Sequence, residues 1–139
     1  MKLLHVLLFS AIIFGLTSFD CFSQSIVTFD IVTIDNRYEK EAMYFYNENW
    51  KKFREEAIKQ GFISGFEMLK TETDEKNTFQ LFLITRYPDS ETFKKMEENF
   101  GIVMKKISPN GPKMLNEIPR NRFVVNITGY DAASLIKNE

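Results

Sequence analysis

Hydrophobic residues follow two distinct patterns along this chain. Four short stretches, residues 24–35, 62–71, 79–87 and 123–130, are rich in β-branched and aromatic side chains, which predicts β-strands. The polar segment 73–77 separates the second stretch from the third. We therefore expect these two strands to form a hairpin.

Two longer segments repeat their large apolar residues every three or four positions, which predicts α-helices. The first segment begins at Asn36, which with Glu39 fits a capping box, and ends at Gly61, expected to adopt the left-handed conformation. The second follows residues 88–90 (Pro-Asp-Ser), which are expected to cap it, and ends at residues 108–112. The two apolar stripes are Met43, Tyr46, Trp50, Phe53 and Ala57, and Phe93, Met96, Phe100, Val103 and Ile107.

The order strand, helix, strand, strand, helix, strand predicts a ferredoxin-like βαββαβ sandwich of the α+β class. We expect a four-stranded antiparallel sheet with both helices on one face. Residues 113–121 receive no assignment. No repeat or linker divides the chain, so residues 24–139 are expected to form one domain.

Side chains alternate between the two faces of a sheet, which divides the strands into two sets. The strongly apolar set is expected to pack on the helices. The other set is about half apolar, which is unusual for a face left to water and typical of an interaction site. A second copy of the sheet is the expected cover, because most soluble oligomers are symmetric. The expected core set is Val27, Phe29, Ile31, Phe62, Phe66, Met68, Phe79, Leu81, Leu83, Phe123, Val125 and Ile127, and the mixed set is Ile26, Thr28, Asp30, Val32, Ile63, Glu67, Leu69, Gln80, Phe82, Ile84, Arg86, Val124, Asn126, Thr128 and Tyr130.

The element order, together with the aromatic first helix at residues 44–53 (YFYNENWKKF), resembles the dimeric α+β barrel superfamily over residues 25–131. That superfamily includes antibiotic-biosynthesis monooxygenases, haem-degrading monooxygenases, stress-responsive barrel proteins and NIPSNAP-like proteins. The resemblance implies a homodimer whose two sheets enclose a barrel, but a fold alone does not identify a function. Haem-degrading members use a histidine ligand near asparagine and tryptophan. Residues 24–139 contain Asn47, Asn49 and Trp50 but no histidine, so no cofactor is expected.

Residues 1–23 have the features of a cleavable signal peptide. A basic residue precedes a largely apolar run at positions 3–16, and small residues precede the expected cleavage site before Gln24. This run is shorter than the roughly 20 residues that span a membrane. We therefore expect a secreted or periplasmic protein. A lipoprotein cleaved before Cys21 is the alternative, which Asp20 at the preceding position disfavours.

Signal cleavage would remove the only cysteine and the only histidine of the chain. This excludes disulfides and nucleophile systems that need histidine or cysteine from the remaining domain. No metal site is expected, because only carboxylates remain as strong ligands and no calcium-loop spacing occurs. The domain keeps 17 basic and 18 acidic residues, a balance that gives no basis for binding nucleic acid or, after signal cleavage, a membrane.

Asp30 and Arg86 are the candidate catalytic pair, since both are assigned to the mixed face of strands expected to be neighbours. Arg86 would hold an anionic or carbonyl group while Asp30 acts as a base or orients the substrate. The alternative is an ion pair that satisfies buried charges at a dimer interface. Trp50 is a candidate for contact with a substrate, although its position on the apolar stripe favours core packing. The candidate binding residues are Trp50, Glu67, Phe82, Arg86, Asn126 and Tyr130.

A homodimer that binds a small hydrophobic or amphipathic molecule is the leading hypothesis for function. A cofactor-independent monooxygenase-like enzyme is the first alternative, and a non-catalytic structural envelope protein is the second. No motif in the sequence decides whether the protein is an enzyme.

Overall fold

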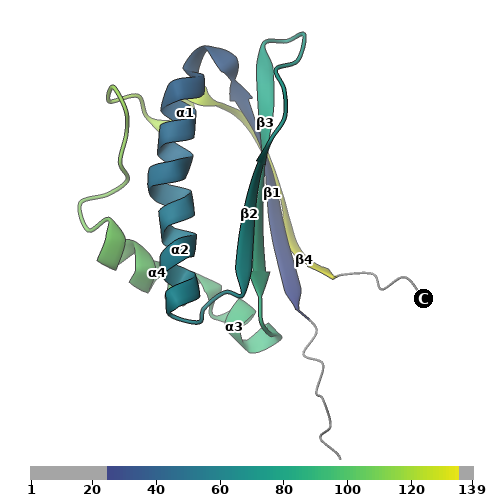
Figure 1. Ribbon diagram of the computed structural model, residues 1–139, viewed down its shortest axis with the longest axis vertical. Helices are drawn as coiled ribbons and strands as arrows, with labels where there is room; N and C mark the ends of the chain where they lie inside the picture. The colour runs from purple at the N-terminus through teal and green to yellow at the C-terminus, as the bar shows by residue number, and fades with distance from the viewer. Residues whose placement is uncertain (1–24, 135–139) are drawn as a thin grey trace, which may run out of the picture.

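A computed structural model describes residues 25–134 as one antiparallel sheet with helices on one side (Figure 1). The strands β1 (Ile26–Asp35), β2 (Gly65–Lys70), β3 (Thr78–Tyr87) and β4 (Val124–Ser134) lie in the order β2-β3-β1-β4. The predicted α+β class and antiparallel sheet are confirmed. The expected signal peptide and Gln24 lie outside the described residues. Within the described part, no helix is long and apolar enough to span a bilayer.

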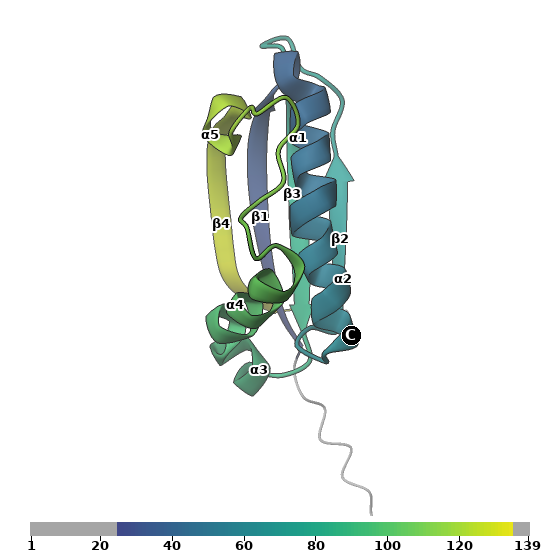
Figure 2. The same cartoon turned by 90° about the vertical axis from the view of Figure 1, so that its left-hand side faces the viewer.

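The first helical segment runs along the sheet as four consecutive pieces (Figure 2). A 3₁₀ turn η1 (Asn36–Tyr38) leads into α1 (Glu39–Phe45), a π-helical turn η2 (Tyr46–Lys51) and α2 (Lys52–Lys59). Its end is as expected, because Gly61 has a φ of 72° and lets Phe62 N–H donate to the carbonyl of Ala57 over 2.9 Å.

The predicted capping box at the start of this segment does not form. Asp35 is the cap instead, and its carboxylate accepts the backbone N–H of Arg37 over 3.0 Å. Asn36 uses its side chain elsewhere, accepting a hydrogen bond from Thr73 and donating one to Asn77 in the β2–β3 turn. The hairpin therefore contacts the start of the helix.

The second helical segment is broken into α3 (Ser90–Lys94) and α4 (Met96–Ile107). Asp89 caps α3 as expected, since its carboxylate accepts the backbone N–H of Thr92 over 2.7 Å. Residues 113–121, which the sequence left unassigned, are mostly irregular. They lead into the short helix α5 (Arg120–Phe123) directly before β4.

The face assignment of β1 from sequence was wrong. Val32 and Ile34 of β1 are fully buried under the helices, together with the β3 residues expected in the core, Phe79, Leu81 and Leu83. Because Ile31 pairs with Phe82 and Val32 with Leu81, the expected core residues Val27, Phe29 and Ile31 lie on the opposite side. A change of one residue in parity reverses every side chain of a strand.

β4 also departs from the expected core. Val125 is 61% exposed, and Ile127, which pairs with the buried Val32 and so faces the helices, is still 42% exposed. The helices therefore leave part of β4 uncovered even on the face of the sheet against which they pack.

The face without helices is called the open face here. The stacked rings of Phe29 and Tyr130, with centroids 4.6 Å apart, lie on it. Leu69, also on this face, is 54% exposed. By pairing register, its members include Val27, Phe29, Ile31, Thr33, Glu67, Leu69, Gln80, Phe82, Ile84, Arg86, Asn126, Thr128 and Tyr130.

Candidate functional site

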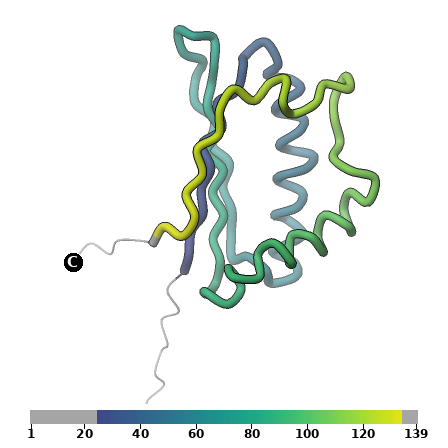
Figure 3. Tube along the Cα trace, turned by 180° about the vertical axis from the view of Figure 1, so that it is seen from behind, coloured from purple at the N-terminus to yellow at the C-terminus, as the bar shows by residue number. Residues whose placement is uncertain are grey.

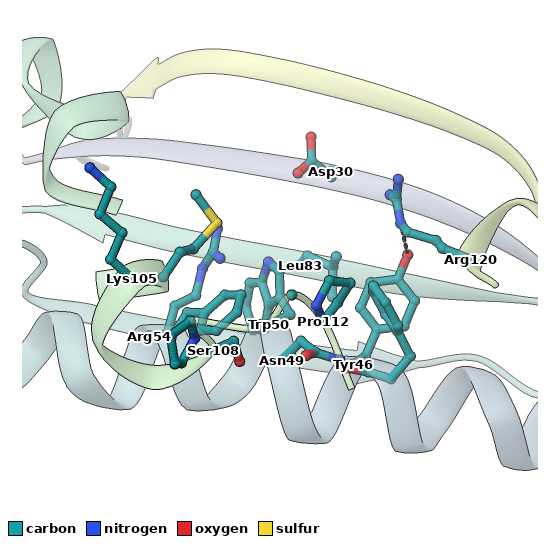
Figure 4. A pocket seen from close by; sticks show the side chains of 15 residues that line it. Asp30, Tyr46, Asn49, Trp50, Arg54, Leu83, Lys105, Ser108, Pro112 and Arg120 are labelled. Carbon is teal, nitrogen blue, oxygen red and sulfur yellow. Dashed lines mark hydrogen bonds between the residues drawn. The ribbon is translucent and has the colours of Figure 1, made fainter. Parts of the chain in front are cut away.

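A cavity of about 620 Å³ lies on the helix side of the sheet (Figure 4). β1 and β3 form one wall, and the first helical segment, α4 and residues 108–112 form the others. Its volume is within the range of small-molecule sites. Its apolar lining includes Phe45, Trp50, Phe53, Leu83, Met104 and Pro112.

The π-helical turn η2 supplies three of the lining side chains, Tyr46, Asn49 and Trp50, all of which are buried. A π turn inserts an extra residue into a helix and rotates the side chains around it. Such turns are rare and occur frequently at functional sites. Here the turn lies beside the cavity, so the local helix irregularity and the cavity coincide.

Residues 108–119, called the strap here, join α4 to α5 along the side of the helical layer that faces away from the sheet (Figure 3). Asn49 fixes the strap to the helix. Its Nδ2 donates to the carbonyl of Lys113 over 2.8 Å, and its Oδ1 accepts the backbone N–H of Lys113 over 2.8 Å. Asn116 adds a bond to Glu41 over 2.8 Å. The strap wall of the cavity is therefore held by specific hydrogen bonds.

Arg54 lies one helical turn after Trp50, and its guanidinium contacts two aromatic rings. Its Cζ is 4.4 Å from the ring centroids of both Trp50 and Phe100. Its Nε donates to Thr85 Oγ1 over 3.4 Å, and no ion pair among the described residues includes it. Burial lowers the pKa of Arg54 to about 10, so the group remains charged at neutral pH.

Asp30 lies on the sheet wall of the same cavity. It pairs with Leu83 on one side and Gly129 on the other, and all three face the helices. A Cβ at position 129 would come within 2.8 Å of Asp30 Oδ1, so the glycine leaves room for the carboxylate in its observed position. Burial raises the pKa of Asp30, an effect that the positive charge of Arg54 opposes. The carboxylate of Asp30 forms no hydrogen bond or ion pair within the described part of the chain.

Arg120 lines the cavity from α5. Its Nε donates to the hydroxyl of Tyr46 over 3.3 Å, shown by the dashed line in Figure 4. Burial raises the pKa of the Tyr46 phenol, so Tyr46 is neutral and accepts this bond. A smaller cavity of about 410 Å³ adjoins the first and shares Asp30 and Arg54 with it.

The structure divides the predicted site residues between the two faces of the sheet. Asp30 and Trp50 line the helix-side cavity. The other candidates, Glu67, Phe82, Arg86, Asn126 and Tyr130, lie on the open face.

The expected pairing of Asp30 with Arg86 is therefore wrong, because β1 residues of even number face the helices while Arg86 pairs with Val27 on the open face. Arg86 instead forms an ion pair with Glu67, with Nη1 and Oε1 3.0 Å apart. Trp50 combines the two interpretations given to it. It is 8% exposed and packs edge-on against Phe66, and it also lines the cavity.

Arg54, Arg120, Tyr46 and Asn49 were not identified as site residues from the sequence. The sequence does contain a signal for Arg54, because it follows Trp50 by four positions, so both lie on one side of a helix. Arg120 carries no such signal, since it lies in the segment left unassigned.

No group of three or more acidic, histidine or cysteine side chains in the described part of the chain could hold a metal ion. Comparisons of the chain with models of known protein families, with curated proteins and with solved structures find no match.

Proposed function

We propose that the protein binds a small amphipathic molecule in the helix-side cavity. The cavity itself is the observation that supports this proposal most strongly. The cavity is open to solvent on one side, as a site that a ligand enters must be. A space of about 620 Å³, lined mainly by apolar side chains, is the arrangement expected of a ligand site rather than of a purely structural domain.

The polar groups of the cavity favour an amphipathic ligand over a purely hydrophobic one. Asp30 and Arg54 lie on the sheet and helix walls, and no ion pair in the described chain includes either. Partly buried polar groups are costly unless a partner satisfies them. A ligand with polar groups would supply such partners.

The test is a titration with N-phenyl-1-naphthylamine, an uncharged fluorescent probe, followed through the emission of Trp50. Trp50 is the only tryptophan of the chain and lines the cavity. Met104→Tyr adds bulk to the cavity wall and is expected to weaken probe binding by about tenfold, the effect of losing about 1.4 kcal/mol.

Met114→Tyr is the matched control, because both methionines are 45% exposed but Met114 does not line the cavity. Equal weakening in the two variants, or no saturable binding to the wild-type protein, would contradict the proposal.

We further propose that the domain is ferredoxin-like and forms a homodimer through its open face, as in the dimeric α+β barrels. The strand order β2-β3-β1-β4 supports the fold. Four strands spaced ~4.8 Å apart, ten residues long in the central pair, give a face of roughly 600 Å² in projection. Its accessible surface is then comparable to the ~800 Å² per partner of a standard interface. Export of this dimer is part of the proposal and rests on residues 1–23 alone.

Light scattering with size-exclusion chromatography tests the dimer. The wild-type protein is expected to elute with twice the mass of one chain at micromolar concentration. Phe82→Lys places a charge at the centre of the open face and is expected to give a folded monomer. A wild-type monomer would refute the dimer without affecting the cavity.

One observation favours a second function, a cofactor-independent monooxygenase-like enzyme. Asp30 lies in a largely apolar cavity with Trp50, and burial raises its pKa. A carboxylate with a raised pKa is a better base for removing a proton from a phenolic substrate. Oxygen uptake with electron-rich phenols that Asp30→Asn abolishes would support the enzyme. Binding without oxygen uptake would support the binding protein.

A further inference from the structure

We propose that the ligand carries a compact oxyanion, such as a carboxylate or sulfonate, on an apolar body, and that Arg54 is its anchor. This inference rests on the proposed function, since it assigns a chemical class to the ligand of the same cavity.

The first argument is that Arg54 has donors without acceptors. A guanidinium has five N–H donors. The one hydrogen bond of Arg54, to Thr85 Oγ1, is long at 3.4 Å, and no carboxylate of the described chain pairs with it. The charge of Asp30 acts on Arg54 without forming an ion pair with it, so an oxyanion from a ligand would offset the cost of desolvating the guanidinium by bonding its N–H groups directly.

The second argument is the fixed orientation of the group. The guanidinium contacts two aromatic rings, since its Cζ is 4.4 Å from the ring centroids of both Trp50 and Phe100. These cation–π contacts hold the group in place without using its N–H donors, so the N–H edge is left to bind a partner. That edge suits the two oxygens of a carboxylate, which arginine binds through parallel hydrogen bonds.

The third argument is the charge around the cavity. The larger cavity is lined by three cationic side chains, Arg54, Lys105 and Arg120, and by one acidic side chain, Asp30 (Figure 4). The whole chain has a net charge of −1, so this excess of positive charge is local. It favours an anionic ligand.

The smaller cavity has the opposite charge balance, with more acidic than basic lining residues. Arg54 is the one cation among its lining residues, whereas Asp30, Glu97 and Asp131 are acidic. An anion is repelled from that side. Arg54 and Asp30 lie on the shared boundary, so the oxyanion is expected on the side of the larger cavity, with the apolar body among Phe45, Trp50 and Leu83.

The experiment compares two probes that differ only in charge. 1-Anilinonaphthalene-8-sulfonate has the same ring system as N-phenyl-1-naphthylamine and adds one sulfonate. Both are titrated into the wild-type protein, Arg54→Gln and Arg86→Gln. Arg86 lies on the open face and serves as the matched control for loss of one arginine charge.

The expected result is that Arg54→Gln weakens sulfonate binding by about tenfold or more, because a charge-assisted bond is lost. Binding of the uncharged probe should stay within about twofold, and Arg86→Gln should change neither probe. Circular dichroism verifies folding. If Arg54→Gln does not fold, Arg54→Lys keeps the charge but not the two-pronged geometry, and is expected to weaken sulfonate binding alone by about threefold or more.

The outcomes separate this inference from the function on which it rests. If neither probe binds the wild-type protein, the cavity is not a ligand site and the proposed function fails. If the uncharged probe binds the wild-type protein and Arg54→Gln leaves the affinity for the sulfonate probe unchanged, Arg54 is not the oxyanion anchor. The proposal that the cavity binds a ligand is then unaffected. Loss of sulfonate binding in Arg86→Gln instead would place the anion on the open face and would also refute the anchor.

Discussion

Asn49 offers the most direct test of how the cavity wall is held, and we expect Asn49→Ala to destabilise the protein by about 2–3 kcal/mol. The side chain is 2% exposed and forms three hydrogen bonds, each 2.8 Å long, of which two go to the backbone of Lys113 and one to the carbonyl of Phe45. Removing one partner of a buried bond costs about 1–3 kcal/mol. Lys113 is exposed, so water can replace part of each hydrogen bond that its backbone loses. We therefore use about 1 kcal/mol for each lost bond, the lower end of that range.

The free energy of unfolding is measured by urea denaturation, with Trp50 emission and circular dichroism as two probes. Asn47→Ala is the control, because Asn47 lies in the same π turn and forms no side-chain hydrogen bond within the described chain. It also measures the gain in helix propensity that any such change to alanine brings, at most about 0.7 kcal/mol. Its own effect should stay within about 0.7 kcal/mol in either direction.

Release of the strap should also change the rate at which trypsin cleaves it. Lys113 is held by the two backbone bonds from Asn49 and by an ion pair with Glu48 whose Nζ and Oε2 are 3.3 Å apart. Asn49→Ala removes the backbone bonds and is expected to speed cleavage after Lys113 more than cleavage after Lys105. A loss below about 0.5 kcal/mol with an unchanged cleavage pattern would refute the view that Asn49 fixes the strap.

Two further predictions concern Asp30. Burial raises its folded-state pKa above the unfolded value of 3.8, so the native state binds more protons between the two values and wild-type stability falls as pH rises through that range. Asp30→Asn should therefore be more stable than the wild type at neutral pH in urea denaturation, and an advantage that persists undiminished below pH 3.8 would contradict this. Gly129→Ala would place a Cβ within 2.8 Å of Asp30 Oδ1 and push the carboxylate aside, leaving stability within about 1 kcal/mol of the wild type. Probe titration should then show altered affinity, whereas unchanged affinity would mean that the position of Asp30 does not matter to the ligand.

The sequence predicted the four strands and the two main helical segments because each of these has a clear local signal. The aromatic stripe of the first helix, the left-handed Gly61 and the Asp89 cap were all confirmed. The face of β1 failed because that strand has apolar residues at both odd and even positions, such as Ile31 and Val32. A period of two cannot orient such a strand. Its register with β3 does so, and register is a long-range property.

The error in β1 also explains why the predicted site was placed on the wrong side. Asp30 shares its parity with Val32 and Ile34, and those two are fully buried by the helices. Assigning them to the open face moved Asp30 there with them and paired it with Arg86. The correct parity places Asp30 in the same cavity as Arg54, which follows Trp50 by four positions but, as a charged residue, was not counted in the apolar stripe.

The cavity itself results from how the second helical segment ends. A helix that continued across β1 and β4 would cover Ile127, yet Ile127 faces the helices and remains 42% exposed. α4 crosses one end of the sheet only, and the chain returns to β4 through the strap (Figure 2). The apolar stripe of α4 was predicted correctly, but its direction across the sheet depends on the break at Lys95 and on packing against α2, and neither leaves a periodic signal. Asp30, Arg54 and Arg120 line the space that α4 does not fill. The site therefore depends on the part of the fold that local sequence patterns do not encode.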